Sequence, residues 1–307
     1  MTVAAPLAPA TITLGAGGKT PRRRSAVWLG LLPFAAYVLL FLAVPAILAV
    51  GSGFFDNAGH FTFQNLTALA DPNILKSFGS SILVSAITAV IGAVVGAVVC
   101  FALLGTRSDG ALRTVVDSAS SVLAQFGGVM LAFAFIATIG ANGLITRLLI
   151  DAGAVENVFN NFNDSGPLIY QVAGLGVVYL YFQVPLMVLT FMPAMEGLKT
   201  TWAEANATLG GSRFTYWTRI GMPILAPAFF GSLILLFANA FSSYATAAAL
   251  VSQPLLISLT IRQQLSSETV LGRSNVAGVV ALGMVVVMIV LMTVYALLQR
   301  RAGRWQR

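Results

Sequence analysis

Six long stretches without Asp, Glu, Lys or Arg are the feature that most limits how this chain folds. They lie near residues 26–52, 80–104, 118–139, 168–192, 224–248 and 276–298. Each is long enough to cross a membrane, since about 20 apolar helical residues span a hydrocarbon core of about 30 Å. Only 9% of the 307 residues are charged, whereas soluble domains carry about 25%. The sequence therefore predicts an all-α membrane protein with a bundle of six transmembrane helices, and it excludes an ordinary soluble enzyme.

The basic residues indicate how these helices are oriented. Six spans leave both termini on one side of the membrane. Thirteen of the 17 Lys and Arg residues lie in the two tails and in the loops after spans two and four, and the positive-inside rule places that side in the cytoplasm. We therefore expect one six-helix transmembrane domain at residues 26–299, a disordered cytoplasmic tail at 1–25 and a basic cytoplasmic tail at 300–307.

The N-terminal segment has two other interpretations. Three arginines followed by an apolar run suggest a signal peptide, but the run of about 27 residues is longer than the 7–15 of a signal peptide. We interpret it as an uncleaved first span. Gly18, Lys19 and Thr20 match the end of a phosphate-binding loop, but no strand precedes them and Pro21 follows. We interpret this part as a disordered tail rather than a nucleotide site.

The chain has one cysteine, Cys100, and one histidine, His60. The single cysteine excludes an internal disulfide and a cysteine-based metal cluster, and the single histidine argues against a histidine-based metal or catalytic site. An intramembrane enzyme is excluded too, because no span contains the metal-binding histidines or the Asp pair that it needs. The sequence predicts no metal, no bound cofactor and no catalytic residue in this chain.

The loop at residues 193–223, on the predicted cytoplasmic side, has the pattern of two short helices. Thr201 and Glu204 fit a capping box at the start of the first helix, and Gly210 fits its end. Ser212 fits the N-cap of the second helix. Aromatic residues in this loop are expected to be exposed to the cytoplasm, which indicates a docking surface for a protein partner. The alternative is a helix pair lying in the lipid headgroup region.

The same loop resembles the EAA signature of permease subunits in bacterial binding-protein-dependent ABC importers. That signature is E-A-A, three residues, G, nine residues and I-x-L-P, and the chain has Glu204-Ala205-Asn206, Gly210 and residues 220–223 at this spacing. Two positions depart from it, with Asn in place of the second Ala and Met in place of Leu. On this resemblance the chain is identified as a member of the family with a MetI-like transmembrane domain, in which the loop forms a cytoplasmic coupling helix-turn-helix.

The resemblance implies a transport subunit rather than an enzyme. The implied partners are two ATP-binding subunits that use ATP and Mg, a second identical or homologous permease, an extracytoplasmic solute-binding protein and the lipid of the bacterial inner membrane, with no nucleic acid. The residues that the resemblance assigns to coupling with the ATPase are Glu204, Ala205, Gly210, Arg213, Phe214, Trp217, Ile220 and Pro223. Capping remains an alternative role for Glu204, and helix termination remains one for Gly210.

Short matches point to the spermidine/putrescine-type subfamily. Leu209 precedes the signature glycine, and Asn142-Gly143-Leu144-Ile145 follows span three, as in permeases of that type. The implied solute is polyamine-like, ferric iron or an aminophosphonate. The candidate residues of the solute path are the polar side chains of Gln125, Asn239, Ser242, Ser243 and Tyr244. Hydrogen bonding between helices is the alternative role for them.

A self-sufficient secondary transporter or channel is the alternative function. Such a protein commonly has an ionisable residue inside the membrane or a pair of broken helices. The six apolar stretches contain no ionisable Asp, Glu, Lys or Arg, and the hydropathy pattern predicts no broken helix. An ABC importer permease is therefore the preferred prediction.

Overall fold

The computed structural model describes residues 25–56, 58–107, 110–153, 168–251, 256–266 and 273–302. Within these ranges the regular structure is helical, apart from one isolated antiparallel bridge between Phe55 and Phe61. The predicted all-helical fold is confirmed. Most of the two predicted tails lies outside the described residues, as does the segment 154–167 of the loop after span three.

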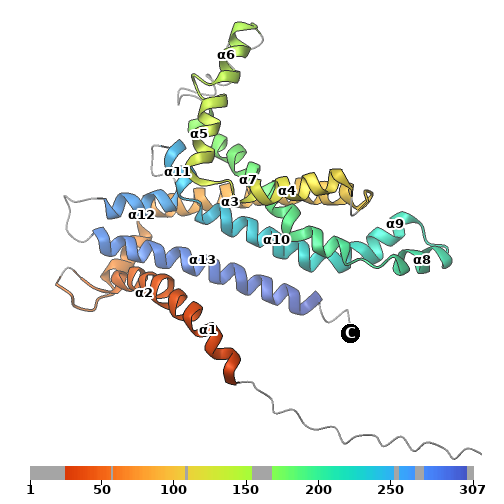
Figure 1. Cartoon of the computed structure of the whole chain (residues 1–307). Coiled ribbons are helices and arrows are strands. Elements are labelled where there is room, and N and C mark those ends of the chain that lie inside the picture. The colour runs from red at the N-terminus through yellow and green to blue at the C-terminus, as the bar shows by residue number, and fades with distance from the viewer. Residues whose placement is uncertain are drawn as a thin grey trace, which may run out of the picture. The chain divides into compact units, whose positions relative to one another are not determined.

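The chain divides into two compact units, residues 1–48 and residues 49–307. Long helices alternate with short helices and turns, among which η2, η3 and η4 are 3-10 turns and η1 and η5 are π-helical (Figure 1). The elements are α1 (Ser25–Val38), η1 (Leu39–Ala43), α2 (Val44–Gly51), η2 (Ser52–Phe54), η3 (Gln64–Ala70), α3 (Pro72–Leu104), α4 (Ala111–Gln125), α5 (Gly128–Ile139), α6 (Leu144–Asp151), η4 (Leu168–Tyr170), α7 (Val172–Glu196), α8 (Thr200–Thr208), α9 (Arg213–Tyr216), η5 (Trp217–Gly221), α10 (Met222–Ser242), α11 (Ala245–Leu250), α12 (Ile257–Leu265) and α13 (Arg273–Ala302).

The described residues contain six helical runs that are long and apolar enough to cross a membrane. The predicted number of spans is therefore confirmed. The runs are Gly30–Phe54, Pro72–Leu104, Gly128–Asp151, Val172–Glu196, Arg213–Ser242 and Asn275–Leu297.

Two of the predicted spans are not continuous helices. Residues 118–139 are not one helix, because α4 ends at Gln125 and α5 begins at Gly128, whose φ is +73°. Residues 224–248 are also interrupted, since α10 ends at Ser242 and α11 begins at Ala245. Both stretches remain apolar across the break, so hydropathy does not reveal it. The expectation of no broken helix is therefore wrong as well.

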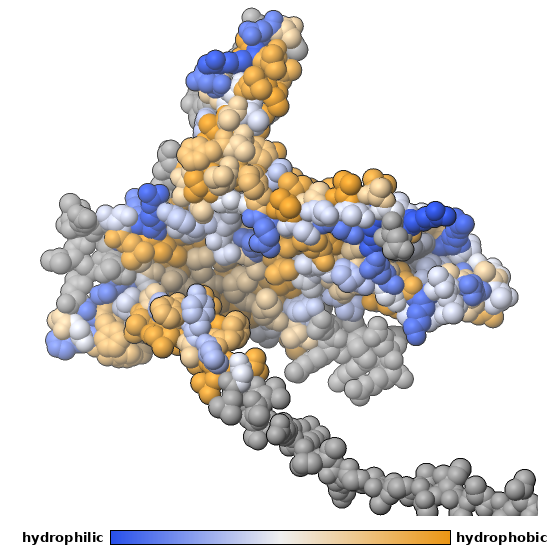
Figure 2. Space-filling model, viewed as in Figure 1, coloured by the Kyte–Doolittle hydropathy of each residue, from blue (hydrophilic) through white to orange (hydrophobic). Residues whose placement is uncertain are grey.

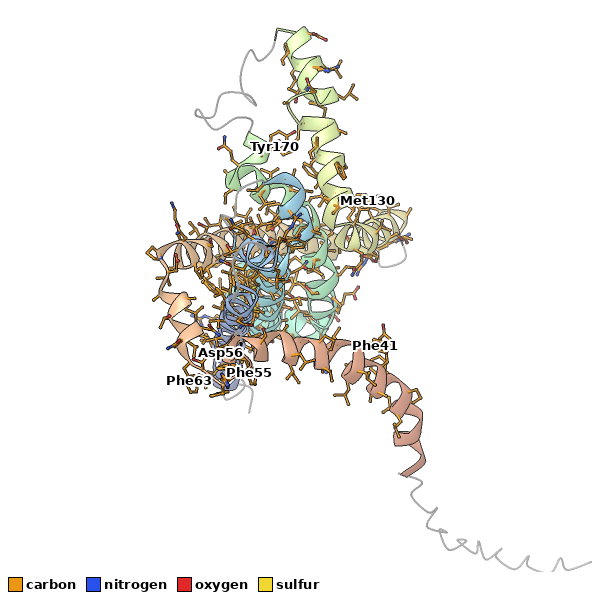
Figure 3. The ribbon with its side chains drawn as sticks, turned by 90° about the vertical axis from the view of Figure 1, so that its left-hand side faces the viewer. Phe41, Phe55, Asp56, Phe63, Met130 and Tyr170 are labelled. Carbon is orange, nitrogen blue, oxygen red and sulfur yellow. The ribbon has the colours of Figure 1, made fainter. Side chains whose placement is uncertain are left out.

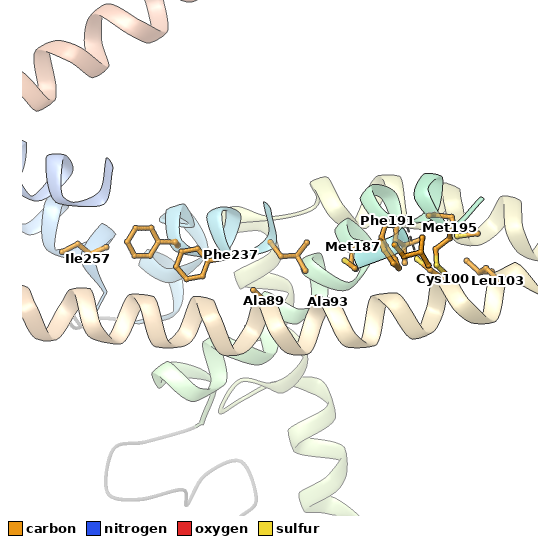
Figure 4. Packing of buried hydrophobic residues seen from close by; sticks show 14 of the residues in the cluster. Ala89, Ala93, Cys100, Leu103, Met187, Phe191, Met195, Phe237 and Ile257 are labelled. Carbon is orange, nitrogen blue, oxygen red and sulfur yellow. Dashed lines mark hydrogen bonds between the residues drawn. The ribbon is translucent and has the colours of Figure 1, made fainter. Parts of the chain in front are cut away.

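The packing of α3 against α7 forms the centre of the second unit. A Cβ atom placed on Gly92 would lie 2.8 Å from Oε1 of Gln183, and one on Gly96 would lie 2.5 Å from Cβ of Met187. The two glycines therefore allow the helix backbones to approach closely, as small residues do in membrane proteins. Buried side chains of α3, α7 and α10 fill the adjoining space (Figure 4).

A second hydrophobic cluster joins α5, α7, α11 and α12. Within this unit, α3, α10, α12 and α13 run side by side, whereas α5 and α6 lead away from them (Figure 1). The helices α8 and α9 lie at one end of α10. The 193–223 loop therefore leads into one end of α10, and the break before α11 follows its other end.

Hydrophobic residues form much of the exposed surface, as expected for helices that face lipid. Orange residues cover much of α5 in Figure 2, and hydrophilic residues gather over α8 and α9. Many large apolar side chains are exposed, including Met130 on α5 and Val98 on α3. The 193–223 loop thus differs from the spans in the polarity of its surface.

Candidate functional site

The 193–223 loop contains α8 and α9, separated by a glycine turn as predicted. The predicted capping box is wrong, because α8 begins at Thr200 and its N-cap is Lys199, with no side-chain cap. The backbone of Lys199 is extended (φ −74°, ψ 132°), so the helix begins before Thr201 and places this residue in its first turn. Glu204 and Ala205 are exposed on α8.

Each glycine of the turn has its own structural reason. Gly210 has φ +76°, the left-handed conformation that ends α8 as predicted. A Cβ atom on Gly211 would collide with Oδ1 of Asn206. The amide of Asn206 donates to the carbonyl of Ser212 (3.1 Å) and its backbone carbonyl accepts from Gly211 (2.8 Å). Asn206, which departs from the EAA signature, therefore holds the turn between the two helices.

The second helix of the loop is continuous with span five. Ser212 caps it as predicted, since its hydroxyl accepts from the backbone N–H of Thr215 at 3.1 Å. The helix then continues through η5 into α10, where the N–H of Met222 donates to the carbonyl of Trp217, five residues back. Pro223 has no N–H, and the π-helical turn lies directly before it. The prediction of a separate short second helix is therefore wrong.

The structure divides the predicted coupling residues into two groups. Arg213 and Phe214 are exposed, with 77% of Phe214 accessible, and Gly210 and Pro223 are exposed too. Trp217 instead packs edge-on against Phe101 of α3, with ring centroids 5.1 Å apart.

Two neighbours of Trp217 in η5 complete this anchored group. A Cβ atom on Gly221 would lie 2.8 Å from the ring of Trp217, and Ile220 is half-buried. Trp217 therefore anchors the loop to the spans, while Glu204, Ala205, Arg213 and Phe214 form its exposed surface.

A cavity of about 950 Å³ lies between α4, α10 and α13, with one residue from α7. Three of the five predicted path residues line it, namely Gln125 at the end of α4 and Asn239 and Ser242 on α10. The rest of its lining is mostly apolar, including Met284 and Met288 of α13. None of its lining residues is charged, so the cavity itself has no charge that would select a cation or an anion.

The other two predicted path residues do not line this cavity. The carbonyl of Ser243 accepts a hydrogen bond from the buried hydroxyl of Tyr179 at 3.0 Å. Tyr244 precedes α11 as its N-cap residue. Both residues belong to the break between α10 and α11, and Ser243 joins that break to α7.

One hydroxyl group joins the two helix breaks. Oγ1 of Thr246, on α11, accepts from the N–H of Gly128 at 3.0 Å and donates to the carbonyl of Gly128 at 3.2 Å. Thr246 is fully buried. It therefore gives the N–H of Gly128, the first residue of α5, an acceptor that the helix itself cannot supply, and it adds a second hydrogen bond to the carbonyl of that residue. Sequence reasoning missed this residue, although two adjacent glycines in an apolar run are a signal for a break.

Comparison with known proteins shows which permeases the chain resembles. No family model matches the chain. It is 25% identical over 258 residues to the spermidine/putrescine transport system permease protein PotB of Haemophilus influenzae, covering 84% of this chain and 85% of that protein. It is 23% identical over 263 residues to a probable sulfate transport system permease protein, cysT, of Zygnema circumcarinatum, covering 84% of each. Over 84% of its length the chain is therefore similar to permease subunits of binding-protein-dependent ABC importers.

The fold of the permease agrees with this assignment. It matches a chain of a bacterial alginate ABC transporter, in complex with an alginate pentasaccharide-bound periplasmic protein, at a TM-score of 0.70 and 16% identity. The match covers 90% of this chain and 94% of that one. The permease is thus a multi-pass membrane protein without ATPase activity of its own. The family replaces the alternative of a self-sufficient secondary transporter or channel.

Proposed function

We propose that this permease moves a small polar solute across the bacterial inner membrane, after an external binding protein delivers it. Two partner ATPase subunits would use ATP and Mg to drive alternating access, and a second permease, identical or homologous, would complete the path. This chain would bind no cofactor. Both termini would lie in the cytoplasm, with residues 26–299 as the transmembrane domain between a disordered tail at 1–25 and a basic tail at 300–307.

The exposed surface of α8 and α9 is the observation that carries this proposal. It presents Glu204 and Ala205 on one helix and Arg213 and Phe214 on the next, across the left-handed turn at Gly210. Phe214 is 77% accessible and Leu209 is 87% accessible on this loop, and the exposure of large apolar side chains to water is unfavourable. Burial against a partner protein removes that cost, and this supports docking of an ATPase subunit here.

The cavity supports a solute path that does not itself select the charge of the solute. Gln125, Asn239 and Ser242 provide hydrogen-bonding groups at neighbouring positions of its lining. The two relatives are named for a cationic solute and for an anionic one. This agrees with an uncharged path and with a separate binding protein that selects the solute. Within the polyamine, ferric iron and aminophosphonate classes, we propose a polyamine-like solute, because PotB, 25% identical over 258 residues, is named for spermidine and putrescine.

The variant Gly210→Asp tests the docking surface. We expect it to reduce co-purification of the ATPase subunits with the tagged permease, and uptake of radiolabelled spermidine by the host cells, by about tenfold or more, equivalent to about 1.4 kcal/mol of binding free energy. Gly59→Asp is the matched control. Gly59 also has a positive φ (+83°), and a Cβ atom placed on it would meet no other atom within 4 Å, but it lies in a different turn.

The two parts of the proposal fail separately. If Gly210→Asp keeps both the ATPase subunits and spermidine uptake, the docking surface is wrong. If the unaltered complex holds its ATPase subunits but the cells take up no spermidine through it, the polyamine class is wrong and the docking surface stands.

A further inference from the structure

Arg113 is the only charged residue that is buried in the part of the chain that the structure describes. It is the third residue of α4, and only 10% of its side chain is accessible. A buried guanidinium is unfavourable unless carboxylates and hydrogen bonds compensate for its lost hydration. The positions of its partners therefore show what this residue holds together.

Two carboxylates face Arg113. Its Nε lies 3.4 Å from Oδ2 of Asp117, one turn further along α4, and its Nη2 donates to Oε1 of Glu196. The pair with Asp117 is local to one helix. The pair with Glu196 joins residues 83 positions apart in the chain, because Glu196 is the last residue of α7. Only this second pair connects two elements.

Neither charge of this pair suits the end of its own helix. A cation near the N-terminus of α4 and an anion at the C-terminus of α7 both oppose the helix dipole. The two helices α4 and α7 pack along each other. The guanidinium of Arg113 therefore lies near the C-terminus of α7 and the carboxylate of Glu196 near the N-terminus of α4, and the dipole of each of these helix ends favours that charge. The pair therefore gains this stabilisation only while α4 and α7 stay packed together.

The pair joins the docking loop to the cavity. Glu196 lies three residues before Lys199, the N-cap of α8. At the other end of α4, Gln125 lines the cavity between α4, α10 and α13. A rigid helix of 15 residues thus runs from the start of the loop to the cavity wall.

We propose that Arg113 is a positioning residue that ties α4 to the docking loop, so that movement of the loop displaces the cavity wall at Gln125. This inference rests on the proposed function, since it needs an ATPase subunit to move the loop. Asp117 holds the guanidinium from within α4 and is secondary, because the Asp117 pair does not cross between helices.

A single-cysteine reporter tests the proposal in the assembled complex. Cys100 is the chain's one cysteine, so Cys100→Ala with Ala124→Cys leaves one thiol, placed in the cavity lining beside Gln125. The complex is purified through a tag on the permease and placed in lipid nanodiscs. The rate of labelling by fluorescein maleimide is then measured without nucleotide and with ATP plus vanadate.

We expect nucleotide to change the labelling rate of the reporter about fivefold or more, the lower end of ordinary allosteric coupling. In Arg113→Gln and in Glu196→Gln that change is expected to fall below about twofold, with the ATPase subunits still bound and ATP still hydrolysed. Arg113→Lys restores part of it, since an ammonium group still pairs with Glu196. Asp117→Asn is the matched control and keeps the full change.

The outcomes separate this inference from the proposed function. A full nucleotide effect in both Arg113→Gln and Glu196→Gln overturns the role of the pair, even though docking stands. Loss of the ATPase subunits from these variants also overturns it, because the residues would then support docking itself. If Gly210→Asp keeps the ATPase subunits, the proposed function fails instead.

Discussion

Two pairs of adjacent glycines in this permease adopt the same turn in opposite surroundings. Gly128 and Gly210 have φ values of +73° and +76°. Gly128 is the first residue of α5, whereas Gly210 lies between α8 and α9. The turn at Gly210 is exposed, and its partners, Asn206 and Ser212, are six residues apart. The turn at Gly128 is joined to the buried Thr246, 118 residues further along the chain.

The difference indicates that the sequence distance between a glycine turn and its hydrogen-bonding partner decides whether the turn can move without losing its hydrogen bonds. A turn closed by neighbouring residues keeps its hydrogen bonds when the whole loop moves, which suits a surface that docks a moving subunit. A turn closed by a distant residue keeps them only while α5 and α11 remain packed together. We therefore expect the turn at Gly128 to act as a fixed joint and the turn at Gly210 as a movable one.

Removal of the distant partner has the largest expected effect. Thr246→Val keeps the shape of the side chain but leaves the half-buried N–H of Gly128 without its acceptor. We expect the free energy of unfolding to fall by about 2 kcal/mol, since one unsatisfied buried group costs about 1–3 kcal/mol. Thermal unfolding of the detergent-solubilised permease measures this loss.

Thr246→Ser is the control, because serine keeps the hydroxyl and loses only a methyl group. We expect it to unfold within about 1 kcal/mol of the unaltered permease. Equal stability of the Val and Ser variants would show that the hydroxyl does not stabilise the joint.

Removal of the local partner has a smaller and confined effect. Asn206→Ala removes the hydrogen bond to Ser212, worth about 0.5–1.5 kcal/mol. We expect faster hydrogen exchange within residues 205–217 and an unchanged melting temperature. Thr208→Ala is the matched control, since its hydroxyl bonds only to Ala205 within α8. A drop in melting temperature as large as that of Thr246→Val would refute the contrast between a movable turn and a fixed joint.

A third glycine turn, at Gly59, gives the smallest expected effect, and that effect depends on pH. Oδ1 of Asp56 accepts from the N–H groups of Ala58 (2.9 Å) and His60 (2.8 Å). These bonds, that of His60 first, hold the pKa of Asp56 below its usual 3.8. Asp56 lies beside Phe55 in this turn (Figure 3).

The direction of the pH effect follows from this lowered pKa. A carboxylate with a depressed pKa stabilises the turn above pH 3.8, and the stabilisation is lost as the pH falls through the lower pKa of the ordered turn. We expect the backbone N–H signal of His60 in NMR spectra to shift over that acidic range. Asp56→Asn should abolish the shift, and an unchanged titration in that variant would contradict this account.

The sequence predicted the properties that depend on composition and short spacing. Long apolar stretches identified six spans because the cost of exposing a polar backbone to lipid makes hydrophobic length decisive. The spacing of Glu204, Gly210 and residues 220–223 located the docking loop, and the preference of Ser212 for an N-cap was confirmed. The capping box at Thr201 failed because the N-cap is Lys199, two residues earlier, and spacing alone does not fix a helix boundary to the residue.

Hydropathy did not reveal the helix breaks or the buried ion pair, and the adjacent Gly127 and Gly128 were the one local signal of a break. An apolar run that includes Gly127 and Gly128 has the same hydropathy whether the helix continues or breaks. The break is stable because Thr246, distant in sequence, satisfies the backbone of Gly128. In the same way, Arg113 and Glu196 are far apart in the sequence, and nothing in the sequence indicates that their side chains meet.

The amino-acid sequence by itself thus determined the number of spans, the signature spacing and the place of the 193–223 loop between spans four and five, because these follow from local composition and short-range spacing. Only the tertiary structure decided which helices break, which polar residues share a cavity and which charges meet. The physical reason is that each of these requires a partner from another helix, and a buried polar group is stable only where that partner is present.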